Sequence, residues 1–270
     1  MAFTTIAFIE DIQGAAAYTE LAAALDQHVT VNGDDLQLPS LNQIVLVAAG
    51  ICSTSDATAR RVRLASPSLR ERALFQISPI NWTASAGGAT DAVPNSPQAI
   101  MDMRGSPLVL VPREKLNAQF LATNFAADRQ HVIVWLADGP IVPVKGPIFS
   151  IRCTGGSPAV AGVWTTTALT FEEDLPAGRY QVVGFRPMST TMVAARLVFV
   201  GGGWRPGAYG CDTYYDLQSD IFRFGNMGVW SEFEDLEPPT VEILANAADA
   251  AAVQEYWLDL IQIRKGPSGA

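Results

Sequence analysis

The chain has few of the side chains that carry most protein chemistry. Its 270 residues include only two histidines, His28 and His131, and three cysteines, Cys52, Cys153 and Cys211. The histidines lie far apart, and no two cysteines have the CxxC spacing, so the sequence predicts no zinc or iron centre. The cysteines are expected to be small buried apolar side chains. We therefore expect neither a metal nor a cofactor.

Excess basic charge and long apolar runs are also absent. The net charge is −9 and the pI is near 4.7, and neither end carries a Lys/Arg-rich arm, so direct binding of nucleic acid is not expected. The apolar runs are too short to span a membrane. The first residues lack a basic region and place Glu10 and Asp11 too early for a signal peptide. The sequence thus predicts synthesis and folding in a cytoplasm.

The common catalytic motifs are missing as well. There is no GxSxG elbow, and Ser157 in Gly155–Pro158 lacks the strand–Ser–helix context that a nucleophile elbow needs. There is no GxxxxGK[ST] loop for phosphate. Gly201–Gly203 follow a predicted strand, but Arg205-Pro206 cannot open a helix there, so we interpret this stretch as an interstrand loop. No catalytic or cofactor-binding residue is predicted, and an enzyme is not expected.

What the chain does contain is a repeat of about half its length. Residues 38–63 read LPSLNQIVLVAAGICSTSDATARRVR, and residues 175–198 read LPAGRYQVVGFRPMSTTMVAARLV. Each block begins with Leu-Pro, runs through an apolar stretch to a Ser-Thr pair and ends on Ala-Arg-x-Val. A repeat of this length predicts tandem duplication of one structural unit.

Further segments match in the same order along the two halves. The matched pairs are 5–12 with 147–154, 75–77 with 222–224, 107–112 with 238–244, and 131–139 with 255–263. The ordered set predicts two domains, residues 1–142 and residues 143–270, with the boundary in the Gly- and Pro-rich stretch 139–146.

Most apolar segments have the composition of β-strands. They are short, rich in β-branched and aromatic residues and bounded by Gly, Pro, Asn or Asp. Segments 164–171 and 179–185 are predicted to pair as a hairpin across a polar turn. Helices are predicted only at 14–27 and 245–260, and 113–122 is ambiguous between helix and strand. The expected fold is all-β: two tandem jelly-roll barrels with a few short helices, with a pair of immunoglobulin-like sandwiches as the nearest rival.

Acidic residues crowd the stretch 212–242. Three interpretations are open: solvated loop charges, which we favour; a Ca²⁺ or other cation site at a subunit contact; and paired carboxylates for glycoside hydrolysis. Strand alternation would place Glu232 and Glu234 on one face, and Phe233 and Asp235 on the other. The acids concerned are Asp212, Asp216, Asp220, Glu232, Glu234, Asp235, Glu237 and Glu242.

The aromatic residues divide into two groups. Trp135 and Trp257 sit inside apolar strands and are expected in the core. Others lie in predicted loops, where they are candidates for an interaction surface, with ordinary packing as the alternative. These loop aromatics are Trp204, Tyr209, Tyr214 and Tyr215.

With the two halves side by side, the chain resembles the double jelly-roll major capsid proteins of tailless icosahedral viruses, bacteriophages in particular. The resemblance is carried by the duplicated LP–strand–ST–AR-x-V unit, the short linker at 139–146 and the absence of catalytic motifs, and it covers nearly the whole chain. It implies homotrimeric, pseudo-hexameric capsomers in an icosahedral shell, with neighbouring capsomers, other capsid proteins and an internal viral membrane as partners. It also implies a place in the virion.

The chain departs from that family in being short for a double barrel, so long surface towers are not expected and a minor or vertex capsid role stays open. Two alternatives of other classes also remain. One is a two-jelly-roll enzyme acting on glycans, with Glu232 or Glu234 in a concave, aromatic-lined pocket. The other is a carbohydrate- or receptor-binding virion protein, with its loop aromatics gathered in one exposed patch.

Overall fold

The computed structural model confirms the expected all-β class: 59% of the chain is strand and 3% is helix, and the sheets are curled. The structure describes residues 3–12, 15–26, 28–52, 58–70, 75–77, 80–81, 100–123, 128–157, 160–189, 191–210, 220–245 and 254–265.

Twenty strands and two short helical turns make up the described chain. The helical turns are α1 (Pro67–Arg70) and the 3-10 turn η2 (Asp220–Phe222). In the part of the chain that the structure describes, no helix combines the length and the apolar character needed to cross a membrane. The strands are β1 (Phe3–Ile12), β2 (Ala15–Glu20), β3 (Thr30–Asn32), β4 (Asp35–Gln37), β5 (Gln43–Cys52), β6 (Thr58–Ala65), β7 (Phe75–Ile77), β8 (Ile80–Asn81), β9 (Ile100–Asp102), β10 (Leu108–Val109), β11 (Lys115–Thr123), β12 (Asp128–Ala137), β13 (Phe149–Gly155), β14 (Thr165–Phe171), β15 (Gly178–Met188), β16 (Met192–Val198), β17 (Gly207–Tyr209), β18 (Ser231–Glu234), β19 (Thr240–Ala245) and β20 (Gln254–Lys265).

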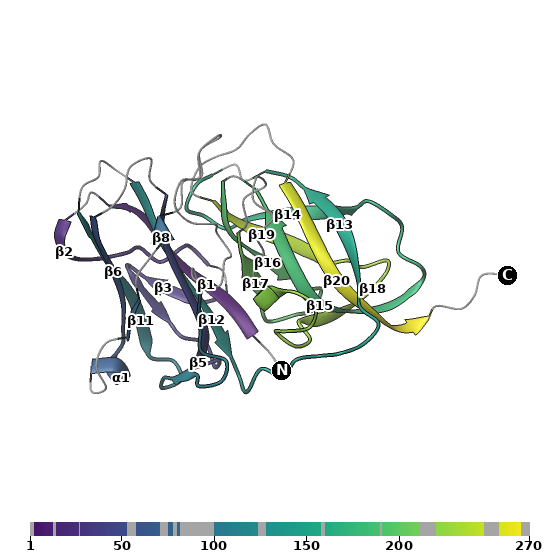
Figure 1. Ribbon diagram of the computed structural model, residues 1–270, viewed down its shortest axis with the longest axis horizontal. Helices are drawn as coiled ribbons and strands as arrows, with labels where there is room; N and C mark the ends of the chain where they lie inside the picture. The colour runs from purple at the N-terminus through teal and green to yellow at the C-terminus, as the bar shows by residue number, and fades with distance from the viewer. Residues whose placement is uncertain are drawn as a thin grey trace.

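The strands form three sheets that pack against one another face to face (Figure 1). The inner sheet has the order β1-β12-β5-β10, with β8 and β9 also paired to β5. The outer sheet has the order β3-β4-β11-β6-β7, with β2 also paired to β11. The C-terminal sheet has the order β17-β16-β19-β14-β13-β20-β15-β18. The inner sheet lies between the other two.

The inner sheet is buried on both faces. On β12, Val132, Val134 and Leu136 pack with the outer sheet, whereas Ile133 and Trp135 pack with the C-terminal sheet. Every one of these side chains has at most 1% of its surface exposed. Successive strand residues point to opposite faces, so a strand covered on both sides reads as a continuous apolar run rather than an alternating one. The sequence of β12, HVIVWLA, has this form.

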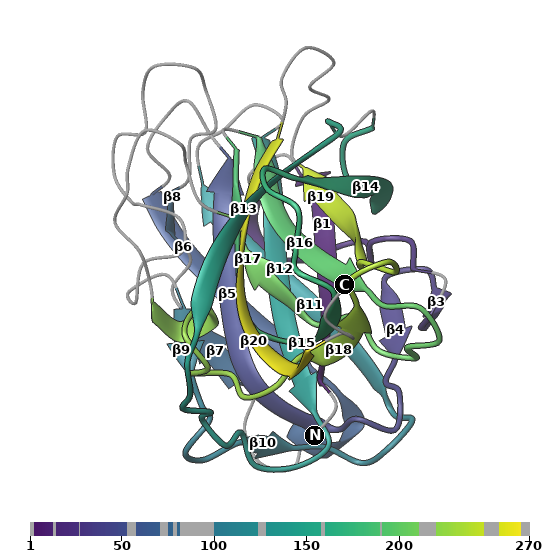
Figure 2. The ribbon, with the colours of Figure 1, turned by 90° about the vertical axis from the view of Figure 1, so that its right-hand side faces the viewer.

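The C-terminal sheet curls around its own core. Its strand β15 contacts β16 and β17, which stand at the other end of the pairing order. Seen from the side of this sheet, β15 and β20 lie in front, and β5 and β12 of the inner sheet lie behind them (Figure 2). The core of the curled sheet and its contact with the inner sheet form one continuous apolar cluster.

The predicted hairpin of 164–171 with 179–185 is wrong. Strand β14 pairs with β13 and β19, and β15 pairs with β20 and β18, so the two consecutive strands share no hydrogen bonds. The polar turn between them crosses from one side of the curled sheet to the other. Composition located the turn correctly, but it does not specify which strand a neighbour pairs with.

The predicted helices are wrong where the structure describes them. Ala15–Glu20 form β2, which pairs with β11, and the Leu21 N–H donates to the Ala118 carbonyl at 2.9 Å. Residues 254–260 belong to β20, while 246–253 lie outside the described residues. The free edges of β11 and β15 offer backbone partners to these segments, and this tertiary pairing outweighs the helix propensity of alanine. The ambiguous stretch 113–122 lies largely in β11.

The repeated blocks occupy matching places in the pairing order. Block 38–63 contains β5 and β6, and block 175–198 contains β15 and β16. Both β5 and β15 pair with the last strand of their half, while β6 and β16 pair with the strand before it. The matches of 75–77 with 222–224 and of 107–112 with 238–244 do not hold, because their members fall on elements with different pairing.

Candidate functional site

The acidic residues of β18 alternate as predicted but are paired with arginines. Phe233 is buried between Glu232 and Glu234. Glu232 lies 2.7 Å from Arg179, and Glu234 lies 2.8 Å from Arg264. Both carboxylates border an open depression of about 210 Å³. Neither is an unpaired carboxylate in an enclosed, aromatic-lined pocket, which acid–base catalysis on glycans would require.

Of the other acids of 212–242, Glu237 lines the same depression as Glu232 and Glu234, whereas Asp235 and Glu242 have partners elsewhere. Asp235 accepts a hydrogen bond from the Gly178 N–H at 2.8 Å, and Glu242 lies in a separate buried network described below. Asp212 and Asp216 lie outside the described residues, and so does the side chain of Asp220. Within the described ranges, no group of three or more His, Cys, Asp or Glu side chains is arranged to hold a metal ion.

The predicted aromatic surface is contradicted at Tyr209, which is fully buried. Its ring lies against Trp135 and His131, because β17 faces the inner sheet rather than solvent. Trp204 is half-buried and packs on the core between the inner and outer sheets. Tyr214 and Tyr215 lie outside the described residues.

Two predictions about single residues are confirmed, and a third is confirmed in part. Trp135 is a core residue with 0% exposure, and Cys153 is a buried free cysteine. Burial raises the pKa of the Cys153 thiol to about 12, so it is an inert packing group. Trp257 is only partly buried. The side chain of Cys52 and all of Cys211 lie outside the described residues.

The most elaborate polar arrangement lies where the inner sheet meets the C-terminal sheet, a contact that we call the seam. Here the Trp135 indole N–H donates to the Gly207 carbonyl at 2.8 Å. The Thr5 N–H donates to the Arg205 carbonyl at 2.9 Å, and the Arg205 N–H donates to Thr4 Oγ1 at 3.3 Å. Backbone and side-chain hydrogen bonds thus tie β1 and β12 to the segment around β17.

His131 and Tyr209 form a second polar contact across the seam. His131 Nε2 lies 2.5 Å from the Tyr209 hydroxyl, and both side chains are fully buried. Burial lowers the pKa of His131 to about 3, because the apolar surroundings disfavour the imidazolium. The imidazole is therefore neutral at neutral pH.

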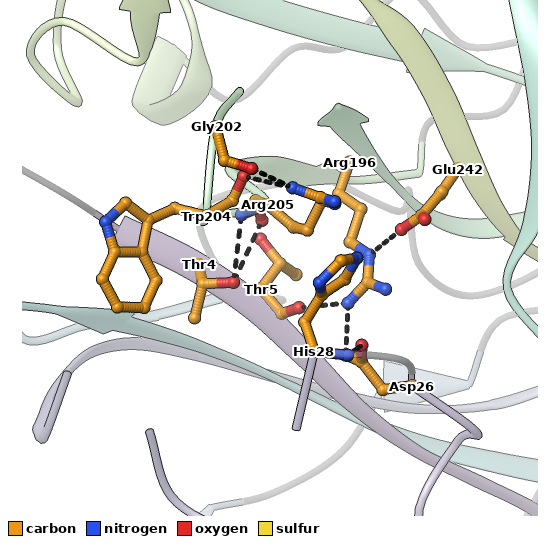
Figure 3. Close-up of polar contacts among 9 residues, drawn as sticks. All are labelled: Thr4, Thr5, Asp26, His28, Arg196, Gly202, Trp204, Arg205 and Glu242. Carbon is orange, nitrogen blue, oxygen red and sulfur yellow. Dashed lines mark hydrogen bonds and ion pairs between the residues drawn. The ribbon is translucent and has the colours of Figure 1, made fainter. Parts of the chain in front are cut away.

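Arg196 is the centre of the seam (Figure 3). Its Nη1 donates to Asp26 Oδ2 at 2.6 Å and to the Thr5 carbonyl at 3.0 Å, and its Nε donates to Glu242 Oε2 at 2.6 Å. The guanidinium also lies 4.1 Å from the centroid of the Trp164 ring. The Arg196 and Asp26 side chains are 1% and 3% exposed. One guanidinium thus joins a carboxylate of the N-terminal half to a carboxylate of β19.

Two more basic groups border this network (Figure 3). Arg205 is 7% exposed, and its Nη1 donates to the carbonyls of Gly202 at 2.9 Å and Trp204 at 3.1 Å. Burial lowers the pKa of Arg205. His28 is exposed, and its backbone N–H donates to Asp26 Oδ1 at 2.8 Å. Partial burial and, after it, the charge of Arg205 lower the pKa of the His28 imidazole.

The seam network holds two sheets together. Both carboxylates are neutralised by Arg196, and no cysteine, serine or lysine belongs to the network as the described residues show it. No motif or spacing in the sequence predicts this site. A signal was present, because Arg196 interrupts the apolar strand MVAARLV, and a charge in such a strand is seldom buried without a partner.

A groove of about 410 Å³ opens beside the seam. It is lined by the β9–β10 turn, by the segment between β12 and β13 and by Asn226. Asp102 holds Arg104 through both carboxylate oxygens, and Arg104 Nη1 donates to the Asn226 carbonyl at 2.7 Å. The Arg104 side chain therefore contacts both halves of the chain at this groove.

Compared with models of known protein families and with curated proteins, the chain matches none.

Proposed function

We propose that the protein is the major capsid subunit of a tailless icosahedral bacteriophage, built as a double jelly roll and assembling through homotrimeric, pseudo-hexameric capsomers. Its domains would be residues 1–142 and 143–270. Its partners would be other copies of itself, other capsid proteins and an internal viral membrane, and its location the virion. The observation that carries the proposal is the strand order, which both halves share.

The C-terminal half supplies the clearest support. A jelly roll has eight strands in two Greek keys. One of its sheets contains the first, eighth, third and sixth strands, and the other contains the second, seventh, fourth and fifth. The order β13-β20-β15-β18 corresponds to the first set, and β14-β19-β16-β17 to the second.

The N-terminal half supports the same assignment. The inner sheet order, β1-β12-β5 followed by β9 and β10, corresponds to the first set. In the outer sheet, β11 pairs with β6, β6 pairs with β7, and both β2 and β4 pair with β11, which corresponds to the second set. In this half, β9 and β10 together take the place of the sixth strand, and β2 and β4 together take the place of the second. In the C-terminal half a single strand, β18 or β14, takes each of these places.

A coat subunit must also transmit lateral force without changing shape. Arg196 and Trp135 tie the two halves together through buried contacts, and the apolar cluster at the seam is continuous with the core of the C-terminal sheet. Cores packed in this way have low compressibility. The close packing of the seam therefore supports a role as a building block.

Electron microscopy and light scattering on the purified protein test the proposal. We expect trimers, or shells under assembly conditions such as raised protein concentration or added divalent cations. A monomer under every condition tried would contradict a coat function. Binding to a glycan array by such a monomer would favour the receptor-binding alternative, and hydrolysis of a glycan would favour the enzyme.

A further inference from the structure

Arg205 differs from Arg196 because one side of its guanidinium group makes no hydrogen bond to a described residue. Its Nη1 donates to two backbone carbonyls, but its Nε is buried with no hydrogen-bond partner, and no described residue accepts a hydrogen bond from Nη2. Nε and Nη2 together form the side of a guanidinium that grips two oxygens of a carboxylate or phosphate. A buried cation with this side empty is costly, and burial already lowers the pKa of Arg205.

The carboxylates near Arg205 do not bind this edge. Asp26 and Glu242 are the acids whose charges act on it, and both are hydrogen-bonded to Arg196. Arg196 adds a second positive charge, and His28 supplies a ring that can take a proton. No described carboxylate is therefore left to bind the free edge.

The turn that precedes Arg205 is exposed to solvent. Gly201 and Gly203, which precede Arg205, each have open space where a side chain would begin. Gly201 has a φ of +69°, a backbone conformation that glycine adopts readily and other residues rarely do. Glycine-rich turns let a backbone approach an anion closely.

We propose that the Nε–Nη2 edge of Arg205, with His28 beside it, binds a small oxyanion such as phosphate or sulfate at the seam. The bound anion would neutralise a buried charge at the contact of the two halves. It would therefore stabilise the folded chain and bring the His28 imidazole closer to a negative charge. This inference does not depend on the proposed capsid function.

The first test uses the unmodified protein and needs no substitution. His28 and His131 are the only histidines, and His131 is too deeply buried to titrate near neutral pH. His28 is thus the one imidazole that proton NMR can follow between pH 5 and 8. We expect phosphate to raise the pKa of His28 relative to chloride at equal ionic strength. Equal pKa values in the two salts would overturn the proposal.

The second test locates the site. Phosphate should raise the melting temperature Tm of the wild type by about 2–4 °C over matched chloride, once its concentration is well above Kd. The shift should vanish in Arg205→Met and persist in Arg264→Met, whose arginine is exposed and bound to Glu234. If Arg205→Met does not fold, Arg205→Lys, which keeps the charge but lacks the two-pronged edge, should show a weakened shift. An undiminished shift in both Arg205 variants would overturn the site.

The anion must also be distinguished from a carboxylate of a second copy. Both measurements are therefore made at a protein concentration where light scattering finds a single species. If Arg205→Met abolished self-association while phosphate had no effect on the wild type, the edge would belong to a subunit contact and the anion proposal would be wrong. Failure of the protein to form trimers or shells would leave the anion result unaffected.

Discussion

Trp135 of β12 donates its indole N–H to the main-chain carbonyl of Gly207 in β17, at 2.8 Å, across the contact of the two halves. The tryptophan is fully buried and also lies 5.1 Å, centroid to centroid, from Phe222. A large side chain in the middle of one strand thus recognises the backbone of a segment about seventy residues later. This pairing fixes the position of β17 against the inner sheet, because a hydrogen bond, unlike apolar packing, has one acceptor and one direction.

Replacing Trp135 by phenylalanine should therefore destabilise the protein. The variant loses a buried hydrogen bond and part of the ring volume, and we expect the free energy of unfolding to fall by about 1–3 kcal/mol. Urea unfolding followed by circular dichroism measures the loss. Trp204→Phe removes the same indole group at a half-buried position and should lower the free energy of unfolding by less. Equal losses would show that the Gly207 contact contributes nothing specific.

Arg196→Met should be one of the most damaging single substitutions in the chain. It leaves the buried Asp26 and the partly buried Glu242 without their guanidinium, and breaking a buried ion pair in this way costs about 3–5 kcal/mol. Denaturant unfolding gives the value. The matched control is Arg264→Met, whose exposed pair with Glu234 should contribute no more than about 1 kcal/mol. Adding Asp26→Asn and Glu242→Gln to Arg196→Met should recover part of the loss, and no recovery would argue against the buried-charge explanation.

Gly207→Ala tests how closely the two sheets approach. An added Cβ would lie 2.5 Å from the Ala195 carbonyl oxygen and 2.8 Å from Thr5 Oγ1, so neighbouring backbone would have to move. We expect a loss of about 1–3 kcal/mol, as for overpacked cores. Gly105→Ala meets open space and should be close to neutral. Thermal unfolding of the two variants separates a steric effect from the general effect of removing glycine.

Stability should fall with acid because of His131. Its folded pKa is about 3 and its unfolded value is about 6.5. Between these values the unfolded chain binds a proton that the folded chain does not, so stability declines as the pH drops below about 6.5, by up to about 1.4 kcal/mol per pH unit. Unfolding free energies measured from pH 7 to 5 should show this slope. The slope should be clearly shallower in His131→Gln and less so in His28→Gln, because the pKa of the more exposed His28 imidazole is lowered as well.

The sequence predicted the strands well where burial and composition agree. The apolar run of β12, with Trp135 at its centre, and the repeated blocks that became β5–β6 and β15–β16 were recognised because these strands need β-branched residues on a buried sheet. It failed at Ala15–Glu20, where alanines favour a helix in isolation and the edge of β11 imposes a strand. Local composition contains no information about that edge.

The seam illustrates a second limit of the sequence. Tyr209 follows a Gly- and Pro-rich stretch, a pattern that predicts a surface position, yet the contact with His131 buries it completely. In the sequence, Arg196 stands out only as part of the repeat and as a charge within the apolar strand MVAARLV. Its partners Asp26 and Glu242 are remote in the chain, and a single sequence gives no signal that brings such residues together. Both errors concern contacts between the halves, which no local pattern describes.

The doubly covered inner sheet has a consequence for how the chain is made. The side chains of Ile133 and Trp135 are ready to pack as soon as β12 leaves the ribosome, but the strands that cover them, β16 and β17, are translated some sixty or seventy residues later. During that interval a wide apolar surface is uncovered, and nascent chains on one polysome could associate through it. We expect an N-terminal fragment ending near residue 142 to aggregate or to recruit chaperones, and supplying the C-terminal half in trans to restore its solubility.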